Sequence, residues 1–305
     1  MNAMNQNGVR GVGMTAMGVS NDLSDLATRL DEVEATGVSF IELPTYDLDV
    51  VIAGKIHHPQ LRAVKAITTG REVQYSVHGP HPINFFDEAF RLPRHFEVLN
   101  ASMEAAAELG AIHYVVHAGM TPHRQHAALQ DAYDRQRDWL YRGGERAKSL
   151  GLYLCVENIF GDYHGKIHTP TPKRLAEELA LINHSHVWAT LDIGHAWIEL
   201  DFYGLDLVSE CAALAPYARH IHVHDGFGRQ DDIWMYTESE RLAFGHGDLH
   251  LPVGMGAIPW DRLAEACVFP EGVVLNIELA KRYWHLRQAC VDATQTLASK
   301  LRTKA

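Results

Sequence analysis

Short apolar runs alternate along the chain with longer segments in which apolar residues recur at helical spacing. The runs contain β-branched residues and end in Gly, Pro or polar clusters, which is typical of buried strands. Eight strands are predicted in this way, at 9–14, 39–44, 74–80, 111–119, 152–158, 187–191, 219–226 and 273–279. The sixth run stops abruptly at Asp192, Gly194 and His195, so a buried strand delivers a carboxylate and an imidazole to one point.

Helical segments follow the strands. Leu23, Leu26 and Leu30, for example, share one helical face, and Gly37 ends that helix. Further helices are expected near 61–67, 93–110, 127–150, 171–182, 205–214, 259–267 and 286–301. Because no linker or break in composition interrupts this alternation, it predicts the α/β class and a single (β/α)8 TIM barrel domain over residues 1–305. A doubly wound sheet is the alternative, but no Gly-x-Gly-x-x-Gly sequence opens a helix after the first strand.

Two connections are long for a compact barrel. One follows the fifth strand, at 159–170, and the other follows the seventh, at 225–258. Loops of this length are usually functional, and both would lie at the C-terminal face of the barrel, where barrel active sites form.

Composition narrows the possible functions. The net charge of -11 argues against a surface that binds nucleic acid. It does not exclude a small anionic substrate, because the local potential can differ from that of the whole chain. No run reaches the length of a membrane span, and the first residues lack the pattern of a signal peptide. The four cysteines are scattered, which favours a reducing, cytoplasmic location. The oligomeric state is open between a monomer and a homo-oligomer.

Histidines and acids gather where the predicted strands end. They are His78, His117, Glu157, Asp192, His195, His222, Glu278 and, from the long loop after the seventh strand, Asp248 and His250. Buried carboxylates need a partner charge, and no Lys or Arg stands at these strand ends. Mixed imidazole and carboxylate ligation suits zinc, manganese, iron or cobalt, so the pattern predicts a site for a divalent metal.

The motifs around these residues resemble the xylose isomerase-like TIM barrel superfamily, which contains sugar phosphate isomerases and epimerases and also endonuclease IV. The resemblance is carried by Val77-His-Gly-Pro, Val116-His-Ala-Gly, Val156-Glu-Asn, Leu191-Asp-Ile-Gly-His, His222-Val-His-Asp, Asp248-Leu-His and Asn276-Ile-Glu. Asn84 also stands where the superfamily has an asparagine, and we expect it to contact substrate.

The resemblance implies two alternative metal sites. Sugar epimerases of the superfamily hold one metal with four residues, which here are Glu157, Asp192, His222 and Glu278. The endonuclease branch holds three zinc ions and uses, in addition, His78, His117, His195, Asp248 and His250. One to three divalent ions are therefore implied.

The two sites imply different reactions. In the isomerase or epimerase reading, Glu157 and Glu278 exchange a proton with a carbohydrate through an enediolate. In the phosphodiesterase reading, a metal-activated hydroxide attacks phosphorus. A non-catalytic sugar or metal binder is the third reading. Two positions depart from the ketose 3-epimerases, whose acid six residues after Glu157 is Tyr163 here and whose arginine six residues after His222 is Gly228.

Further residues are candidates for contact with a small carbohydrate substrate. They are His195, His224, Asp225, Asn84, Trp234 and Arg229. For His224 and Asp225 the alternative is hydrogen bonding within the loop, and Trp234 could either cover a sugar ring or pack on the barrel. Taken together, the sequence favours a metal-dependent sugar isomerase or epimerase in carbohydrate metabolism.

Overall fold

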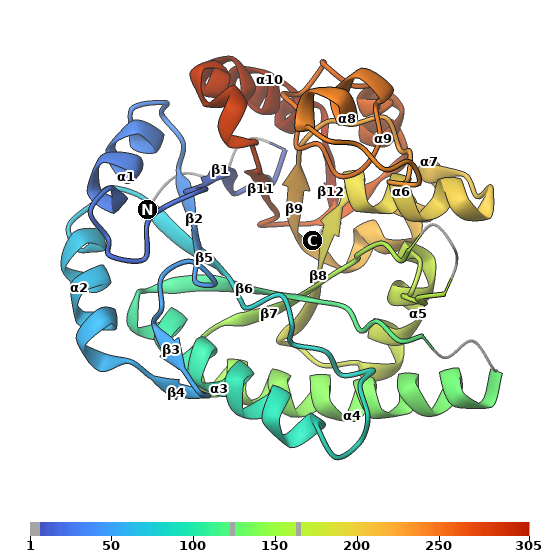
Figure 1. The fold of residues 1–305 in the computed structure, drawn as a ribbon, viewed down its shortest axis with the longest axis horizontal. Coiled ribbons are helices and arrows are strands. Elements are labelled where there is room, and N and C mark those ends of the chain that lie inside the picture. Colours follow the sequence, from blue (N-terminus) through green and yellow to red (C-terminus); the bar gives the residue numbers. More distant parts are fainter. Residues whose placement is uncertain (1–6, 123–125, 163–165, 305) are drawn as a thin grey trace.

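The computed structural model describes residues 7–122, 126–162 and 166–304 and contains a closed barrel of eight parallel strands (Figure 1). Around the barrel the strands are β1 (Gly11–Thr15), β2 (Phe40–Pro44), β5 (Gln74–His78), β6 (Ala111–His117), β7 (Tyr153–Glu157), β8 (Val187–Asp192), β9 (Ala218–Val223) and β11 (Val274–Ile277). Each overlaps one of the eight predicted strands. The predicted TIM barrel fold is therefore confirmed.

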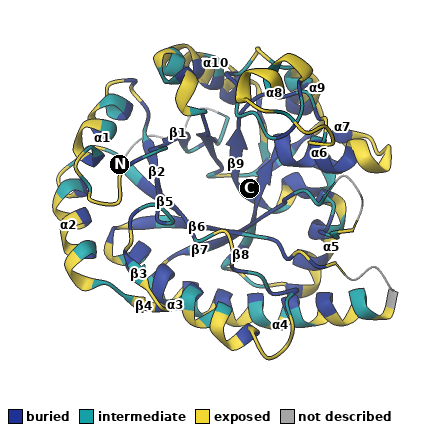
Figure 2. Cartoon of the chain, viewed as in Figure 1, coloured by how far each residue is buried: buried dark blue, intermediate teal, exposed yellow. Residues whose placement is uncertain are grey.

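Helices surround the barrel, with their buried faces turned toward the strands (Figures 1 and 2). They are α1 (Leu26–Glu34), α2 (His58–Thr68), α3 (Leu92–Glu108), α4 (His126–Leu150), α5 (Pro172–Ile182), α6 (Ile193–Tyr203), α7 (Leu207–Leu214), α9 (Trp260–Ala266) and α10 (Arg287–Lys300). In α1 the buried residues are Leu26, Leu30 and Val33. Leu26 and Leu30 lie on the face that the spacing predicts, whereas Leu23, predicted on the same face, precedes the helix and is only partly buried. The core thus lies between the barrel and this layer.

Local sequence sets the ends of several helices. At the start of α5 the Thr171 side chain accepts a hydrogen bond from the Arg174 N–H, and Pro172 occupies the first turn, where its missing N–H costs nothing. The same helix ends at Asn183, whose left-handed conformation (φ 44°) closes the last turn.

Two helices were not predicted. Helix α6 follows β8 directly, and its sequence is too uniformly apolar to show a polar face, because Ile193, Ala196, Ile198 and Leu200 are all buried. Helix α8 (Glu238–Phe244) lies inside the long loop after β9 and begins with a capping box between Thr237 and Glu240. The second long loop is therefore partly helical.

Smaller elements complete the described chain. They are the hairpin of β3 (Val51–Ile52) and β4 (Lys55–Ile56), the pair β10 (Val268–Pro270) and β12 (Arg302–Lys304), and the 3-10 helices η1 (Ala215–Tyr217) and η2 (Lys281–Leu286). The four cysteines are buried and form no disulfide. Among the described residues, no helix has both the length and the apolar character of a membrane span.

Candidate metal centre

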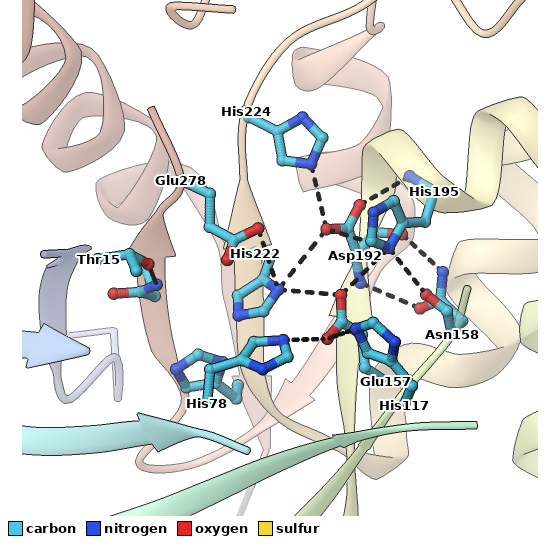
Figure 3. A network of polar contacts seen from close by, with 12 residues as sticks. Thr15, His78, His117, Glu157, Asn158, Asp192, His195, His222, His224 and Glu278 are labelled. Atoms are coloured by element: carbon cyan, nitrogen blue, oxygen red, sulfur yellow. Dashed lines mark hydrogen bonds and ion pairs between the residues drawn. The ribbon is translucent and has the colours of Figure 1, made fainter. Parts of the chain in front are cut away.

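Side chains from the C-terminal ends of the strands converge in one contact network (Figure 3). The register places His117 beside Glu157 and Asp192 beside His222 on neighbouring strands. All nine residues proposed from the sequence as metal ligands lie in this network: His78, His117, Glu157, Asp192, His195, His222, Asp248, His250 and Glu278.

Asp192 is both the last residue of β8 and the N-cap residue of α6. Its Oδ1 accepts a hydrogen bond of 2.7 Å from the His195 N–H, which caps the helix. Asn158, which directly follows the neighbouring strand β7, donates to the Asp192 carbonyl at 2.7 Å and accepts from the Asp192 N–H at 3.0 Å. The capped turn leaves Oδ2 of Asp192 directed into the network, 3.1 Å from His224 Nε2.

The imidazole of His222 is the point at which three carboxylates meet. Its Nδ1 lies 3.1 Å from Glu157 Oε1, 3.5 Å from Glu278 Oε2 and 3.6 Å from Asp192 Oδ2. Figure 3 shows these carboxylates pointing toward His222 from three strand ends. Three carboxylate oxygens from different strand ends therefore lie within 3.6 Å of this one ring nitrogen.

Glu157 also connects this group to further histidines. Its Oε2 lies 3.1 Å from His78 Nε2 and 3.6 Å from His117 Nε2, and its Oε1 lies 3.1 Å from His195 Nδ1. One carboxylate thus contacts imidazoles from three elements in addition to His222.

A second group forms around Asp248 in the loop after β9. Its Oδ2 lies 3.2 Å from His195 Nε2 and 2.7 Å from His250 Nε2. The His224 ring stacks on His250, with 4.1 Å between the ring centroids. The four residues present ligand atoms that all lie within 4.8 Å of one another.

The electrostatics of the network favour a cation. Burial alone would raise the pKa of Glu157, but His222 and His117 hold it well below its usual range. Burial would lower the pKa of His250, yet Asp248 raises it to about 9. His117 is the opposite case, because burial lowers its pKa to about 3 and leaves a neutral ring nitrogen able to bind metal.

The residues present fit a divalent metal ion. In the described chain, every ion pair of Glu157, Asp192, Asp248 and Glu278 is made with a histidine. The three buried carboxylates of Glu157, Asp192 and Glu278 and the partly buried carboxylate of Asp248 therefore lack a permanent counter-charge, and neutral imidazoles would leave them uncompensated. Two buried atoms, His224 Nδ1 and Asp248 Oδ1, also have no hydrogen-bond partner among the described residues. Mixed nitrogen and oxygen donors suit zinc, manganese, iron or cobalt.

A buried carboxylate below the network, Glu42 on β2, was missed in the sequence. Its oxygens are contacted by Thr15 (3.1 Å), Ser76 (3.3 Å), Asn276 (3.1 Å), His220 (3.4 Å) and His222 (3.4 Å). Burial would raise its pKa, but His222 and His220 lower it to about 2, so Glu42 is ionised. It faces Nε2 of His222 while the three upper carboxylates face Nδ1. The only sequence signal was an acid inside an otherwise apolar strand.

His81 was also missed. Its ring centroid lies 5.0 Å from those of His78 and His117, and the three rings present ligand atoms within 4.8 Å of one another. Burial, with a smaller effect of His78, lowers the pKa of His81 to about 4. The sequence His78-Gly-Pro-His81 at a strand end was the signal that could have identified it.

The residues proposed to contact substrate are divided. His195 and His224 lie in the network. The side-chain amide of Asn84 donates a hydrogen bond to the Met120 carbonyl and accepts hydrogen bonds from the N–H groups of Phe86 and Met120. Arg229 is exposed and donates to the Phe244 carbonyl, and Trp234 is 75% exposed.

Asp225 uses its carboxylate in hydrogen bonds within the loop after β9 and to the start of α9. It is buried, and its carboxylate accepts hydrogen bonds from the N–H groups of Gly226, Gly254 and Ile258 and from the Trp260 indole. Loop hydrogen bonding, the alternative recognised in the sequence, accounts for both of its oxygens.

Comparison with known proteins adds a family to this geometry. Residues 30–283 match the family described as xylose isomerase-like TIM barrel. No curated protein matches the chain. Among solved structures, a D-tagatose 3-epimerase-like protein has 19% identity and a TM-score of 0.69, with 95% of this chain and 99% of that chain covered.

Two further solved structures are similar. D-psicose 3-epimerase with D-tagatose, from Clostridium cellulolyticum H10, has 13% identity and a TM-score of 0.66, with 94% of this chain and 99% of that chain covered. The IOLI protein with a bound zinc atom has 16% identity and a TM-score of 0.67, with 94% and 96% covered. At such identities the likeness shows the fold.

Proposed function

The chain belongs to the xylose isomerase-like TIM barrel family, and from that premise we propose that it is a divalent-metal-dependent isomerase or epimerase of a sugar, sugar acid or sugar phosphate. One observation carries this function. Nδ1 of His222 lies within 3.1–3.6 Å of an oxygen from each of Glu157, Asp192 and Glu278. Three carboxylates this close to one imidazole nitrogen would, with that imidazole, supply the ligands for a single Lewis-acidic ion.

Glu157, Asp192, His222 and Glu278 would hold the ion. When bound, the metal supplies a Lewis acid that polarises the carbonyl and hydroxyl oxygens of a sugar. Glu157 and Glu278 come from β7 and β11, which are separated in the barrel by β8 and β9. Carboxylates on different sides of a substrate can remove a proton from the carbon next to its carbonyl and return one to the enediolate.

The burial of the two acids suits this proton transfer. Glu157 is 1% exposed and Glu278 is 6% exposed, so bulk water has little access to either carboxylate. His78 and His195 contact Glu157 and would keep its carboxylate in a fixed orientation. Low water access limits loss of the transferred proton to solvent.

The structural neighbours support the general class of sugar isomerases and epimerases, and not the ketose 3-epimerase subtype. Two of them are named as 3-epimerases or 3-epimerase-like proteins. Gly228 stands where an epimerase arginine is expected, and Tyr163, which stands where an acid is expected, lies outside the described residues. The proposal therefore extends to the reaction class, with a small carbohydrate as substrate.

A second candidate is a multinuclear phosphoesterase resembling endonuclease IV. It is favoured by the convergence of His195, His224, Asp248 and His250, which could hold an additional ion. The chain's net charge of -11 weighs against a nucleic acid substrate.

Proton exchange in heavy water tests the proposal directly. The metal-loaded protein is incubated in D₂O with a panel of ketoses, ketose phosphates and keto sugar acids, and NMR follows loss of the C–H signal next to the carbonyl. We expect exchange with at least one substrate, and loss of that exchange in Glu157→Gln and Glu278→Gln. Glu265→Gln, at an exposed position on α9, is the matched control.

Three outcomes would contradict the function. Unchanged exchange in Glu157→Gln and Glu278→Gln would remove the carboxylates from the mechanism. Metal-dependent cleavage of an abasic-site oligonucleotide, with no exchange on any sugar, would favour the phosphoesterase. Metal binding with neither activity would favour a non-catalytic binder.

A further inference from the structure

A cavity of about 330 Å³ lies beside the candidate metal centre. Asp248 and His250 of the centre line it, together with residues of α8 and of the segment 280–283. Its volume is in the range of sites for small ligands. A ligand in this cavity would therefore be in reach of both the metal centre and the residues on the outer walls.

Three cationic side chains line this cavity: Arg241 on α8, and Lys281 and Arg282 at the start of η2. Arg241 is paired with Asp231 at 2.7 Å. Lys281 and Arg282 form no ion pair within the described part of the chain, and Arg282 donates only to the Ser239 hydroxyl at 3.2 Å. The acids on the lining are Glu238 and Asp248, and Asp248 is surrounded by imidazoles.

The backbone fixes these cations relative to the metal centre. The Ala280 N–H donates to the His250 carbonyl at 3.0 Å, so the start of η2 is attached to the loop that carries a candidate ligand. Lys281 also lies over Gly18, where an added Cβ would be 3.3 Å from its Cδ and 3.8 Å from its Nζ. Gly18, at φ +67°, thus leaves room for the lysine at the barrel mouth.

Cations gathered in one cavity are unusual in a chain with a net charge of -11. A general negative field repels anions, and a local group of Lys and Arg beside a cavity reverses the potential there. Lys binds phosphate as a point charge, and Arg adds hydrogen bonds in a fixed planar geometry. A dianion gains more from such a set than a neutral hydroxyl does.

We propose that this cavity binds the phosphate group of a phosphorylated sugar whose reacting carbons lie at the metal centre. The identity of the reacting part rests on the function proposed above, whereas the phosphate-binding property of the cavity does not. Lys281 and Arg282 supply the charge that is not already paired, and Arg241 supplies a third donor. The substrate class thereby narrows from sugars in general to sugar phosphates.

Calorimetric titration of the metal-loaded protein with inorganic phosphate tests the cavity without requiring turnover. The double variant Lys281→Gln/Arg282→Gln is compared with Arg62→Gln/Lys65→Gln, which removes the same charges from exposed positions on α2. We expect the dissociation constant to rise at least about tenfold in the first variant, as for loss of charge-assisted hydrogen bonds, and to stay unchanged in the second.

Three results would overturn the proposal. These are no phosphate binding by the wild-type protein, equal affinity in both double variants, or binding that chelation abolishes while Lys281→Gln/Arg282→Gln retains it. The last result would mean that the metal alone holds phosphate.

The source of the phosphate is distinguished by parallel titrations with a ketose phosphate, the same ketose without phosphate, and a dinucleotide. The proposal expects the ketose phosphate to bind most tightly, and preference for the dinucleotide would contradict it. Exchange on neutral ketoses without phosphate binding would overturn this inference and leave the proposed function standing. Phosphate binding through Lys281 and Arg282 without exchange on any sugar would overturn the proposed function and leave the phosphate-binding cavity standing.

Discussion

Replacement of Asp225 by Asn should destabilise the loop that carries Asp248 and His250. In the structure Asp225 is 1% exposed, and four donors use its carboxylate. Oδ1 accepts from Gly226 N–H (2.9 Å) and Ile258 N–H (3.2 Å), and Oδ2 accepts from Gly254 N–H (2.7 Å) and Trp260 Nε1–H (3.1 Å). An asparagine amide can accept on only one side, so two of these donors would face an NH₂ group.

The magnitude follows from that count. A hydrogen bond to a charged acceptor contributes about 1.5–3 kcal/mol, so the loss of two gives about 3–6 kcal/mol, less whatever water recovers. Trp260→Phe removes one donor and should cost about 1.5–3 kcal/mol. Asp261→Asn is the surface control, because its partner Lys300 is half-exposed and such pairs contribute at most about 1 kcal/mol.

Urea unfolding and amide hydrogen exchange measure these effects. We expect the order wild type, Trp260→Phe, Asp225→Asn in decreasing stability, with faster exchange at Gly254 and Ile258. Because the Asp225 backbone also pairs with Leu251 through hydrogen bonds of 2.8 Å and 3.0 Å, exchange at Leu251 should rise as well. A loss in Asp225→Asn no larger than that in Asp261→Asn would refute the structural role assigned to this carboxylate.

Three further predictions concern the candidate metal centre. Glu42→Gln should weaken metal affinity by about 10- to 100-fold, because Glu42 faces the Nε2 side of His222 and a carboxylate there orients a ligating imidazole. Competition titration measures the metal affinity, and an affinity equal to that of Glu265→Gln would exclude this orienting role of Glu42. Asp192→Asn and Asp192→Ala should both lose metal, but only the alanine variant also loses the cap of α6. In urea unfolding Asp192→Ala should therefore be less stable than Asp192→Asn by about 1 kcal/mol, and equal stability would contradict the capping function. Chelation should lower the midpoint of thermal unfolding, since an ion present at 100 times its Kd stabilises the fold by about 2.7 kcal/mol. Calorimetry before and after addition of EDTA measures this midpoint, and an unchanged midpoint would mean that no ion is bound.

Much of the fold could be predicted because barrel strands are strongly patterned. Each strand is a short apolar run with turn residues at its ends, and those features are local in the sequence. Helix α6 was missed because burial on nearly all sides removes the polar face that periodicity requires. Helix α8 was missed because its seven residues include no buried one, and its only signal is the capping box at Thr237 and Glu240.

The candidate metal residues could be found because a barrel brings strand ends together whatever the rest of the chain does. The hydrogen-bond partners of loop residues could not be predicted in the same way, because the loop conformation is not fixed by the strand pattern. Asn84 and Asp225 carry polar groups that could contact a substrate, yet in the structure they bond mainly to backbone groups of loops, and Asp225 also accepts from the Trp260 indole. Glu42 lies one layer below the strand ends, so a search confined to those ends passes over it.

Metal content of the purified protein tests the central claim most directly. Mass spectrometry of the dialysed wild-type chain should find about one or more divalent ions per chain among zinc, manganese, iron and cobalt, as the donor set requires. Asp192→Asn should retain far less metal, and Glu265→Gln should match the wild type. A wild-type chain that holds no such ion and shows no binding heat when titrated with each metal would contradict a metal centre at these strand ends.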